Sequence, residues 1–101
     1  MTATSYELSP EAQKDLFEIW SRIADDNVEL ADRIEGEFHK LFESLAQFPG
    51  QGHSRRDLTS RPVLFIALYS FLVVYRPDPN PVRIMAVVRG SREIGRILKA
   101  R

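Results

Sequence analysis

The chain has 101 residues, with 14 basic and 14 acidic side chains and a formal net charge of zero. This length has room for a single domain and excludes multidomain machinery. The absence of cysteine excludes disulfide scaffolds, thiol catalysis and thiolate zinc sites. With 44% hydrophobic residues, no signal-like N-terminus and no long apolar stretch, we expect a folded, soluble, cytoplasmic protein that does not contact a membrane.

The zero net charge conceals a division between the two halves of the chain. Residues 1–50 carry eleven acidic and four basic side chains, a net charge of −7, whereas residues 51–101 carry three acidic and ten basic side chains, a net charge of +7. Nine of those ten are arginine, which favours planar contact with carboxylates or phosphates. We therefore expect an acidic partner, either nucleic acid or protein, unless acidic helices simply neutralise a basic sheet within the fold.

Two helices are predicted in the acidic half, after a short strand over residues 5–8. Ser9 is suited to cap the first helix and Pro10 to begin it. Apolar residues then recur at spacings of three and four as far as residue 24, and Trp20 lies on this stripe, so we expect it in the core. Asn27 is suited to cap a second amphipathic helix that ends at residues 49–50. Helices connected this tightly form an antiparallel hairpin.

The basic half is predicted to form strands. Residues 49–62 form a polar connector, residues 63–68 and 71–75 a strand hairpin, and residues 82–89 a third strand after a proline-rich turn. Strict alternation in the third strand places Val82, Ile84, Ala86 and Val88 against the helices, and Arg83, Met85, Val87 and Arg89 on the opposite, open face. Residues 94–98 are compatible with a short helix. The prediction is an α+β domain of order β-α-α-β-β-β, with an antiparallel sheet and both helices on one face.

Few side chains in this sequence are arranged for catalysis. His39 and His53 lack the spacing of metal ligands, His39 is expected on the helix surface, and no nucleophile or phosphate-loop motif is present, so we assign no metal, cofactor or catalytic residue. Arginine and tyrosine remain, in a group expected to gather at one end of the third strand. Such a group suits phosphate binding or metal-free RNA cleavage, in which Arg stabilises charge and Tyr, Lys or His transfers protons. The alternative is structural, with Tyr75 packed at the sheet edge and the arginines paired with helix acids. The expected group contains Arg83, Arg89, Arg92, Tyr69, Tyr75, Arg76 and Arg55-Arg56.

A series of short motifs extends over nearly the whole chain in a fixed order. They are Leu8-Ser9-Pro10-Glu11-Ala12 with Asp15-Leu16, Glu18-Ile19-Trp20 and Ile23-Ala24, then Ala31-Asp32-Arg33-Ile34, then Leu45-Ala46-Gln47-Phe48-Pro49 with Gly52 and Arg55, then Val73-Val74-Tyr75-Arg76, and last Val87-Val88-Arg89-Gly90-Ser91-Arg92-Glu93. In this order the chain resembles the ParE toxins of the RelE/ParE superfamily, which are the toxin halves of bacterial type II toxin–antitoxin systems.

The resemblance implies one of two activities, because ParE toxins inhibit DNA gyrase whereas RelE toxins cleave mRNA. Leu72 stands near the position of a RelE arginine, no lysine lies in the connector, and no tyrosine follows Tyr75. Arg89 stands where the ParE pattern usually has histidine. We therefore expect a non-enzymatic gyrase inhibitor. The alternatives are a RelE-like endoribonuclease using Arg and Tyr, and an inactive toxin-like binding module.

The resemblance also implies a partner, a cognate antitoxin, ParD-like or other, whose C-terminal segment folds onto the toxin in a hetero-oligomer. Contact with DNA is expected only indirectly, through the antitoxin. The residues expected to face the target are Arg89, Arg92, Arg76, Tyr75 and Arg96. The residues expected to bind the antitoxin are Arg83, Met85 and Val87 on the strand, and Arg55 and Arg56 in the connector.

Overall fold

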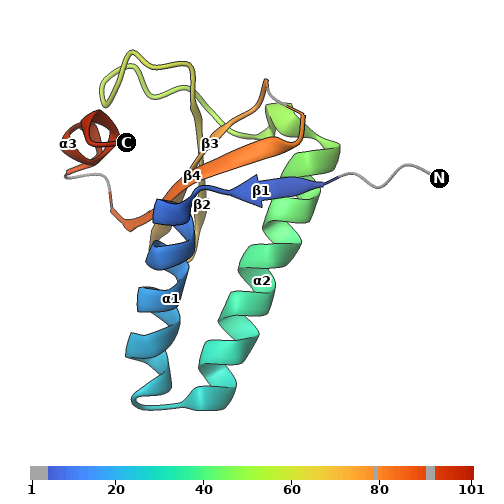
Figure 1. The fold of residues 1–101 in the computed structure, drawn as a ribbon, viewed down its shortest axis with the longest axis vertical. Helices are drawn as coiled ribbons and strands as arrows, with labels where there is room; N and C mark the ends of the chain where they lie inside the picture. Colours follow the sequence, from blue (N-terminus) through green and yellow to red (C-terminus); the bar gives the residue numbers. More distant parts are fainter. Residues whose placement is uncertain (1–4, 79, 91–92) are drawn as a thin grey trace.

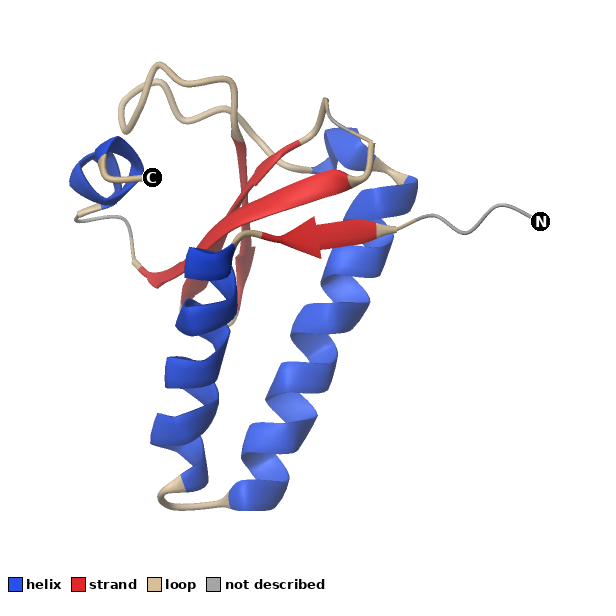
Figure 2. Cartoon of the chain, in the orientation of Figure 1, coloured by secondary structure: helices blue, strands red, loops and turns tan. Residues whose placement is uncertain are grey.

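The computed structural model describes residues 5–78, 80–90 and 93–101. A four-stranded sheet of order β1-β4-β3-β2 is accompanied by three α-helices and one 3₁₀ turn (Figures 1 and 2). The predicted α+β class and the order of the elements are confirmed. The elements are β1 (Tyr6–Leu8), α1 (Pro10–Ala24), α2 (Val28–Gln47), η1 (Pro49–Gln51), β2 (Leu64–Leu68), β3 (Phe71–Arg76), β4 (Val82–Arg89) and α3 (Ile94–Lys99).

The sheet is mixed, so the prediction of a purely antiparallel sheet is wrong at one edge. β2, β3 and β4 are antiparallel neighbours, but β1 joins the outer edge of β4 in parallel, with Tyr6 opposite Val82 and Leu8 opposite Ile84. A three-residue strand shows alternation but carries no signal of its direction, which depends on where the helix hairpin returns the chain.

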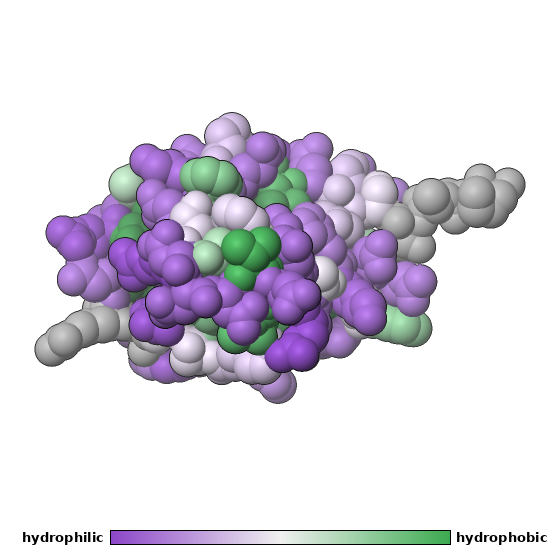
Figure 3. Space-filling model, turned by 90° about the horizontal axis from the view of Figure 1, so that it is seen from below, coloured by the Kyte–Doolittle hydropathy of each residue, from purple (hydrophilic) through white to green (hydrophobic). Residues whose placement is uncertain are grey.

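Two caps hold the helix hairpin in the predicted places. Ser9 Oγ accepts the N–H of Ala12 at 3.0 Å, and Asn27 Oδ1 accepts the N–H of Leu30 at 2.9 Å. Both helices pack on one face of the sheet through a core that includes Leu16, Phe38, Phe42, Val73 and Ile84. At the end that carries the α1–α2 turn, Figure 3 shows isolated apolar side chains among hydrophilic ones.

A β-bulge in β4 overturns the predicted alternation of that strand. Tyr75 lies opposite Ile84 and Val74 opposite Ala86, so Met85 is an extra residue. Beyond it the faces exchange: Val87, 3% exposed, packs toward the helices, and Ala86 packs on the other face. Met85 is itself only 8% exposed. The predicted open face of Arg83, Met85, Val87 and Arg89 therefore does not exist, because one inserted residue breaks the two-residue period.

The second face of the sheet is also covered. Ile94 and Leu98 of α3 pack with Val74 and Ala86 into a second buried cluster, which also contains Val63, the residue before β2. The expectation of an open second face is therefore wrong, because α3 folds back over it (Figure 1).

Two aromatic side chains of the hairpin differ from their predicted environments. Trp20 is half-buried rather than in the core: its Nε1 donates to Asp32 Oδ1 at 2.8 Å, and its ring stacks on exposed Phe17. His39 is also half-buried, with its Nδ1 hydrogen-bonded to the Tyr6 hydroxyl at 2.6 Å. Both therefore hold elements together, Trp20 between α1 and α2 and His39 between α2 and β1.

Candidate functional site

The predicted gathering of arginines at one end of β4 is wrong. Arg83 lies opposite Arg76, whereas Arg89 lies opposite Phe71. Arg83 and Arg89 are six positions apart along the strand, roughly 20 Å, so these side chains lie at opposite ends of the sheet. Arg83 pairs with Glu7 of the neighbouring β1 at 2.5 Å.

The other predicted arginines are divided between the connector and α3. Arg55 pairs with Asp57 at 2.8 Å; their hydrogen bond raises the pKa of Arg55 and lowers the pKa of Asp57. Arg56 is exposed in the connector, and Arg96 is exposed on α3, where it pairs with Glu93. Arg92 lies outside the described residues. The structural alternative, in which the arginines pair with acidic side chains, thus holds for Arg55, Arg83 and Arg96. Their partners do not lie in the two long helices, and two of the three are only two or three residues away in sequence.

Tyr75 is fully buried, so its predicted place on a target-facing surface is wrong. Its hydroxyl donates to the carbonyl of Pro49 at 2.7 Å and accepts the N–H of Gly52 at 2.9 Å. Burial raises the pKa of this hydroxyl. A Cβ on Gly52 would lie 2.8 Å from the same oxygen, so glycine permits this close approach. Tyr75 therefore anchors the start of the connector to β3.

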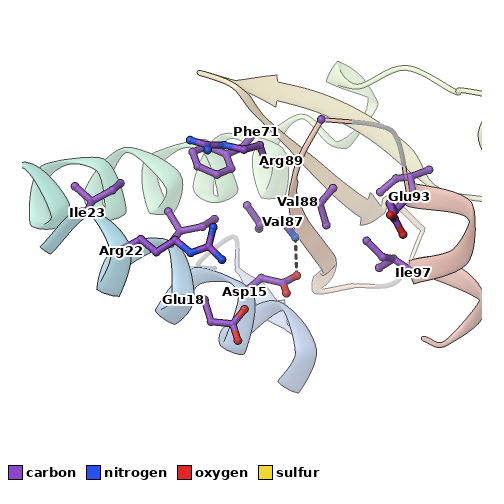
Figure 4. Close-up of a pocket in the computed structure, with 13 residues that line it drawn as sticks. Asp15, Glu18, Arg22, Ile23, Phe71, Val87, Val88, Arg89, Glu93 and Ile97 are labelled. Carbon is purple, nitrogen blue, oxygen red and sulfur yellow. Dashed lines mark hydrogen bonds between the residues drawn. The ribbon is translucent and has the colours of Figure 1, made fainter. Parts of the chain in front are cut away.

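A groove of about 330 Å³ lies between α1, the end of β4 and the start of α3 (Figure 4). Arg89, expected at a target-facing surface, lies on its rim. Isoleucine, valine and phenylalanine side chains form most of the surface, and charged side chains border it. The apolar lining residues are Ile19 and Ile23 of α1, Phe71 of β3, Val87 and Val88 of β4, and Ile94 and Ile97 of α3.

Asp15 connects the walls of this groove, a role that the sequence analysis did not assign. Its Oδ2 accepts the N–H of Val87 at 3.0 Å and a guanidinium N–H of Arg101 at 2.7 Å. The hydrogen bond with Asp15 raises the pKa of Arg101. The available signal was position, because Asp15 follows Ala12 by three residues and precedes Ile19 by four, which places a carboxylate on the buried side of α1.

Arg22 and Arg89 border the other end of the groove. The guanidinium of Arg89 lies 5.4 Å from the centre of the Phe71 ring, a cation–π contact, and Figure 4 shows Arg22 on the same side of the groove. Both side chains are exposed, and neither forms an ion pair with any residue that the structure describes. Two guanidinium groups beside an apolar surface suit a partner that has both carboxylates and apolar side chains.

The described residues contain neither a metal-binding cluster nor a membrane-spanning helix. Within residues 5–78, 80–90 and 93–101, no group of three or more histidine, aspartate or glutamate side chains is arranged to hold a metal ion. None of the described helices has the length and apolar character needed to cross a membrane.

The arrangement of a helix hairpin on a small mixed sheet is that of a solved toxin–antitoxin protein. A chain of the structure titled "Chromosomal ParDE TA system from P. aeruginosa" superposes with a TM-score of 0.71 and 20% sequence identity, over 86% of this chain and 96% of that chain. The two chains therefore share a fold.

The sequence assigns the family. Residues 6–94 match the family described as "ParE toxin of type II toxin-antitoxin system, parDE", and the chain belongs to this family. A search of curated proteins returned no match.

Proposed function

We propose that this chain inhibits DNA gyrase by protein binding and is neutralised by a cognate antitoxin. Membership of the ParE toxin family supports a toxin role. The observation that favours binding over RNA cleavage is the position of Tyr75, whose hydroxyl is buried and already bonded to Pro49 and Gly52. A ribonuclease that used arginine and tyrosine would need such a hydroxyl beside the bound phosphate.

The proposed target-facing surface is centred on Arg89 and Arg96, which are exposed at the end of β4 and on α3. Exposed guanidinium groups attract an acidic partner and fix its orientation. Arg76 lies at the other end of the sheet, so its participation stays a separate prediction.

The test combines induction in cells with a purified supercoiling assay. We expect the wild-type chain to arrest growth, induce DNA breaks and inhibit ATP-dependent supercoiling by gyrase, without early mRNA cleavage. The R89A/R96A double variant should need at least about tenfold more protein for the same inhibition, and R33A, at an exposed position of α2, should match wild type. Early transcript cleavage with unaffected gyrase would establish the ribonuclease instead, and the absence of any growth defect would establish the inactive binding module.

A further inference from the structure

The groove between α1, β4 and α3 has the size and lining of a site for a few side chains. Its volume of about 330 Å³ is at the lower end of the range of ligand sites, roughly 300–1,000 Å³. Ile19, Ile23 and Ile97 line it and are all partly exposed. Apolar side chains of a partner would bury this surface, at about 25 cal/mol per Å² removed from water.

The charges on the rim of the groove favour a negatively charged partner. Asp15 is neutralised by Arg101 and Glu93 is paired with Arg96, so two of the three lining carboxylates already have cations. Glu18 is the third. Its single negative charge is outnumbered by the two guanidinium groups of Arg22 and Arg89, neither of which is paired within the described residues. Within the described residues, the unpaired charge at the rim is therefore positive and favours a partner with carboxylates next to its apolar side chains.

We propose that this groove binds a segment of the antitoxin in which apolar side chains are followed by Asp or Glu. The apolar side chains lie on Ile19, Ile23 and Ile97, and the carboxylates pair with Arg22 and Arg89. This inference rests on the proposed neutralisation by an antitoxin and names its docking site. It also gives a mechanism for neutralisation, because a segment in the groove covers Arg89 of the proposed target-facing surface.

A protein segment fits the groove better than nucleic acid does. The apolar floor of the groove offers no hydrogen-bond partner to a sugar–phosphate backbone. Any phosphate beyond those that pair with the two arginines would approach Glu18 or Glu93 and be repelled. Single-stranded nucleic acid is bound instead by positively charged grooves in which aromatic side chains stack on the bases. In this groove the aromatic side chain is Phe71, and the guanidinium of Arg89 already lies over its ring.

The test measures the affinity of the full chain for the full-length protein encoded beside it. We expect R22E and I97D each to weaken binding at least about tenfold. Two matched controls, I97L within the groove and R33E at an exposed position of α2, should stay within about threefold of wild type. The difference in affinity between R22E and wild type should become smaller at high salt, because the contact that R22E loses is ionic.

A second readout locates the segment without any substitution in the groove. In methyl NMR spectra of the complex, the Ile19, Ile23 and Ile97 resonances should shift more than those of Ile34 and Ile66, which do not line the groove. Circular dichroism and thermal unfolding identify any variant that fails to fold, and R22E, at an exposed position, tests the proposal if I97D is misfolded.

The outcomes separate this inference from the proposed function. One outcome is that wild type binds the neighbouring protein, R22E and I97D bind it equally well, and the groove methyl resonances do not shift. The proposed docking site is then wrong, while the proposed neutralisation stands. If R22E and I97D weaken only gyrase inhibition, the groove belongs to the target and the docking site is again wrong. Methyl shifts in the chain alone that depend on its concentration would assign the groove to a second copy. If the neighbouring protein does not bind wild type, neutralisation itself is wrong and the docking site falls with it.

Discussion

Asp15 and Arg101 are joined by two parallel hydrogen bonds, of 2.7 Å from Arg101 Nη1 to Asp15 Oδ2 and 3.0 Å from Nη2 to Oδ1. The side chains are 13% and 17% exposed. Arg101 Nη1 also donates to the carbonyl of Met85 at 3.2 Å, and Asp15 accepts the N–H of Val87. The pair thus satisfies backbone groups of the bulged residue Met85 and of Val87 beyond it, and it connects α1, β4 and the residue Arg101 after α3.

Replacing Asp15 with Asn should lower the free energy of unfolding by about 2 kcal/mol. The substitution keeps the size of the side chain but leaves the mostly buried guanidinium of Arg101 without its counter-charge. Urea unfolding monitored by circular dichroism measures the change. D57N is the matched control, because Asp57 pairs with Arg55 at an exposed site and its loss should produce no measurable change. Equal stabilities of D15N and wild type would show that the ion pair contributes nothing to the fold.

Gly52 should not tolerate a side chain. A Cβ there would lie 2.8 Å from the Tyr75 hydroxyl oxygen and 2.9 Å from the carbonyl oxygen of Phe65, which is backbone and cannot easily move. We expect G52A to lose about 1–3 kcal/mol of stability, as in overpacked cores. G50A, two residues earlier in the connector with nothing within 4 Å of its Cβ, should change stability much less. Equal losses in thermal unfolding experiments on the two variants would contradict the close approach.

The buried hydroxyl of Tyr75 predicts a loss of stability at alkaline pH. Burial raises the pKa of this group in the folded chain above its ordinary value of 10.0, so the unfolded chain releases the proton first. The folded state therefore binds more protons above pH 10, and stability falls as the pH rises from there through the folded pKa. The pKa values of Tyr6 and Tyr69 are raised as well, Tyr6 mainly by burial and Tyr69 mainly by its hydrogen bond to Glu37.

Absorbance at 295 nm should therefore show tyrosine ionisation at higher pH in the folded chain than in urea. Y75F should be less stable at neutral pH, because the N–H of Gly52 and the carbonyl of Pro49 lose their partner. It should also lose less additional stability between pH 10 and 11.5 than wild type. The same alkaline loss in both proteins would assign the effect to other groups.

Most of the fold follows from local signals in the sequence. The caps at Ser9 and Asn27, the apolar stripes of the two helices and the proline-rich turn each act within a few residues, so their consequences are visible in the chain. The parallel pairing of β1 and the bulge at Met85 depend on contacts with residues distant in sequence. Neither leaves a local pattern, and the bulge changed which residues of β4 face the helices.

The candidate site was predictable only in part for the same reason. Arg89 was identified from its motif and lies on the groove. Tyr75 carried an equally clear motif, yet its hydroxyl is used inside the fold, because the residues that bury it belong to the distant connector. Asp15 was identified only as part of a motif in the first helix, and no role was predicted for Arg22. Their place on the groove depends on α3, which is 70 or more residues away along the chain.

The two helix caps should differ in their contribution to stability. Asn27 is exposed and caps α2 through a single bond, so N27A should lower the free energy of unfolding by about 1 kcal/mol. Ser9 is 2% exposed, and its hydroxyl also donates to the carbonyl of Met85 at 3.2 Å. S9A removes the cap and a buried partner of that carbonyl, and we expect a loss of about 2 kcal/mol. Urea unfolding of both variants measures the difference. Equal losses would mean that the bond from Ser9 to the bulge contributes no stability, since the capping bonds themselves are of similar length.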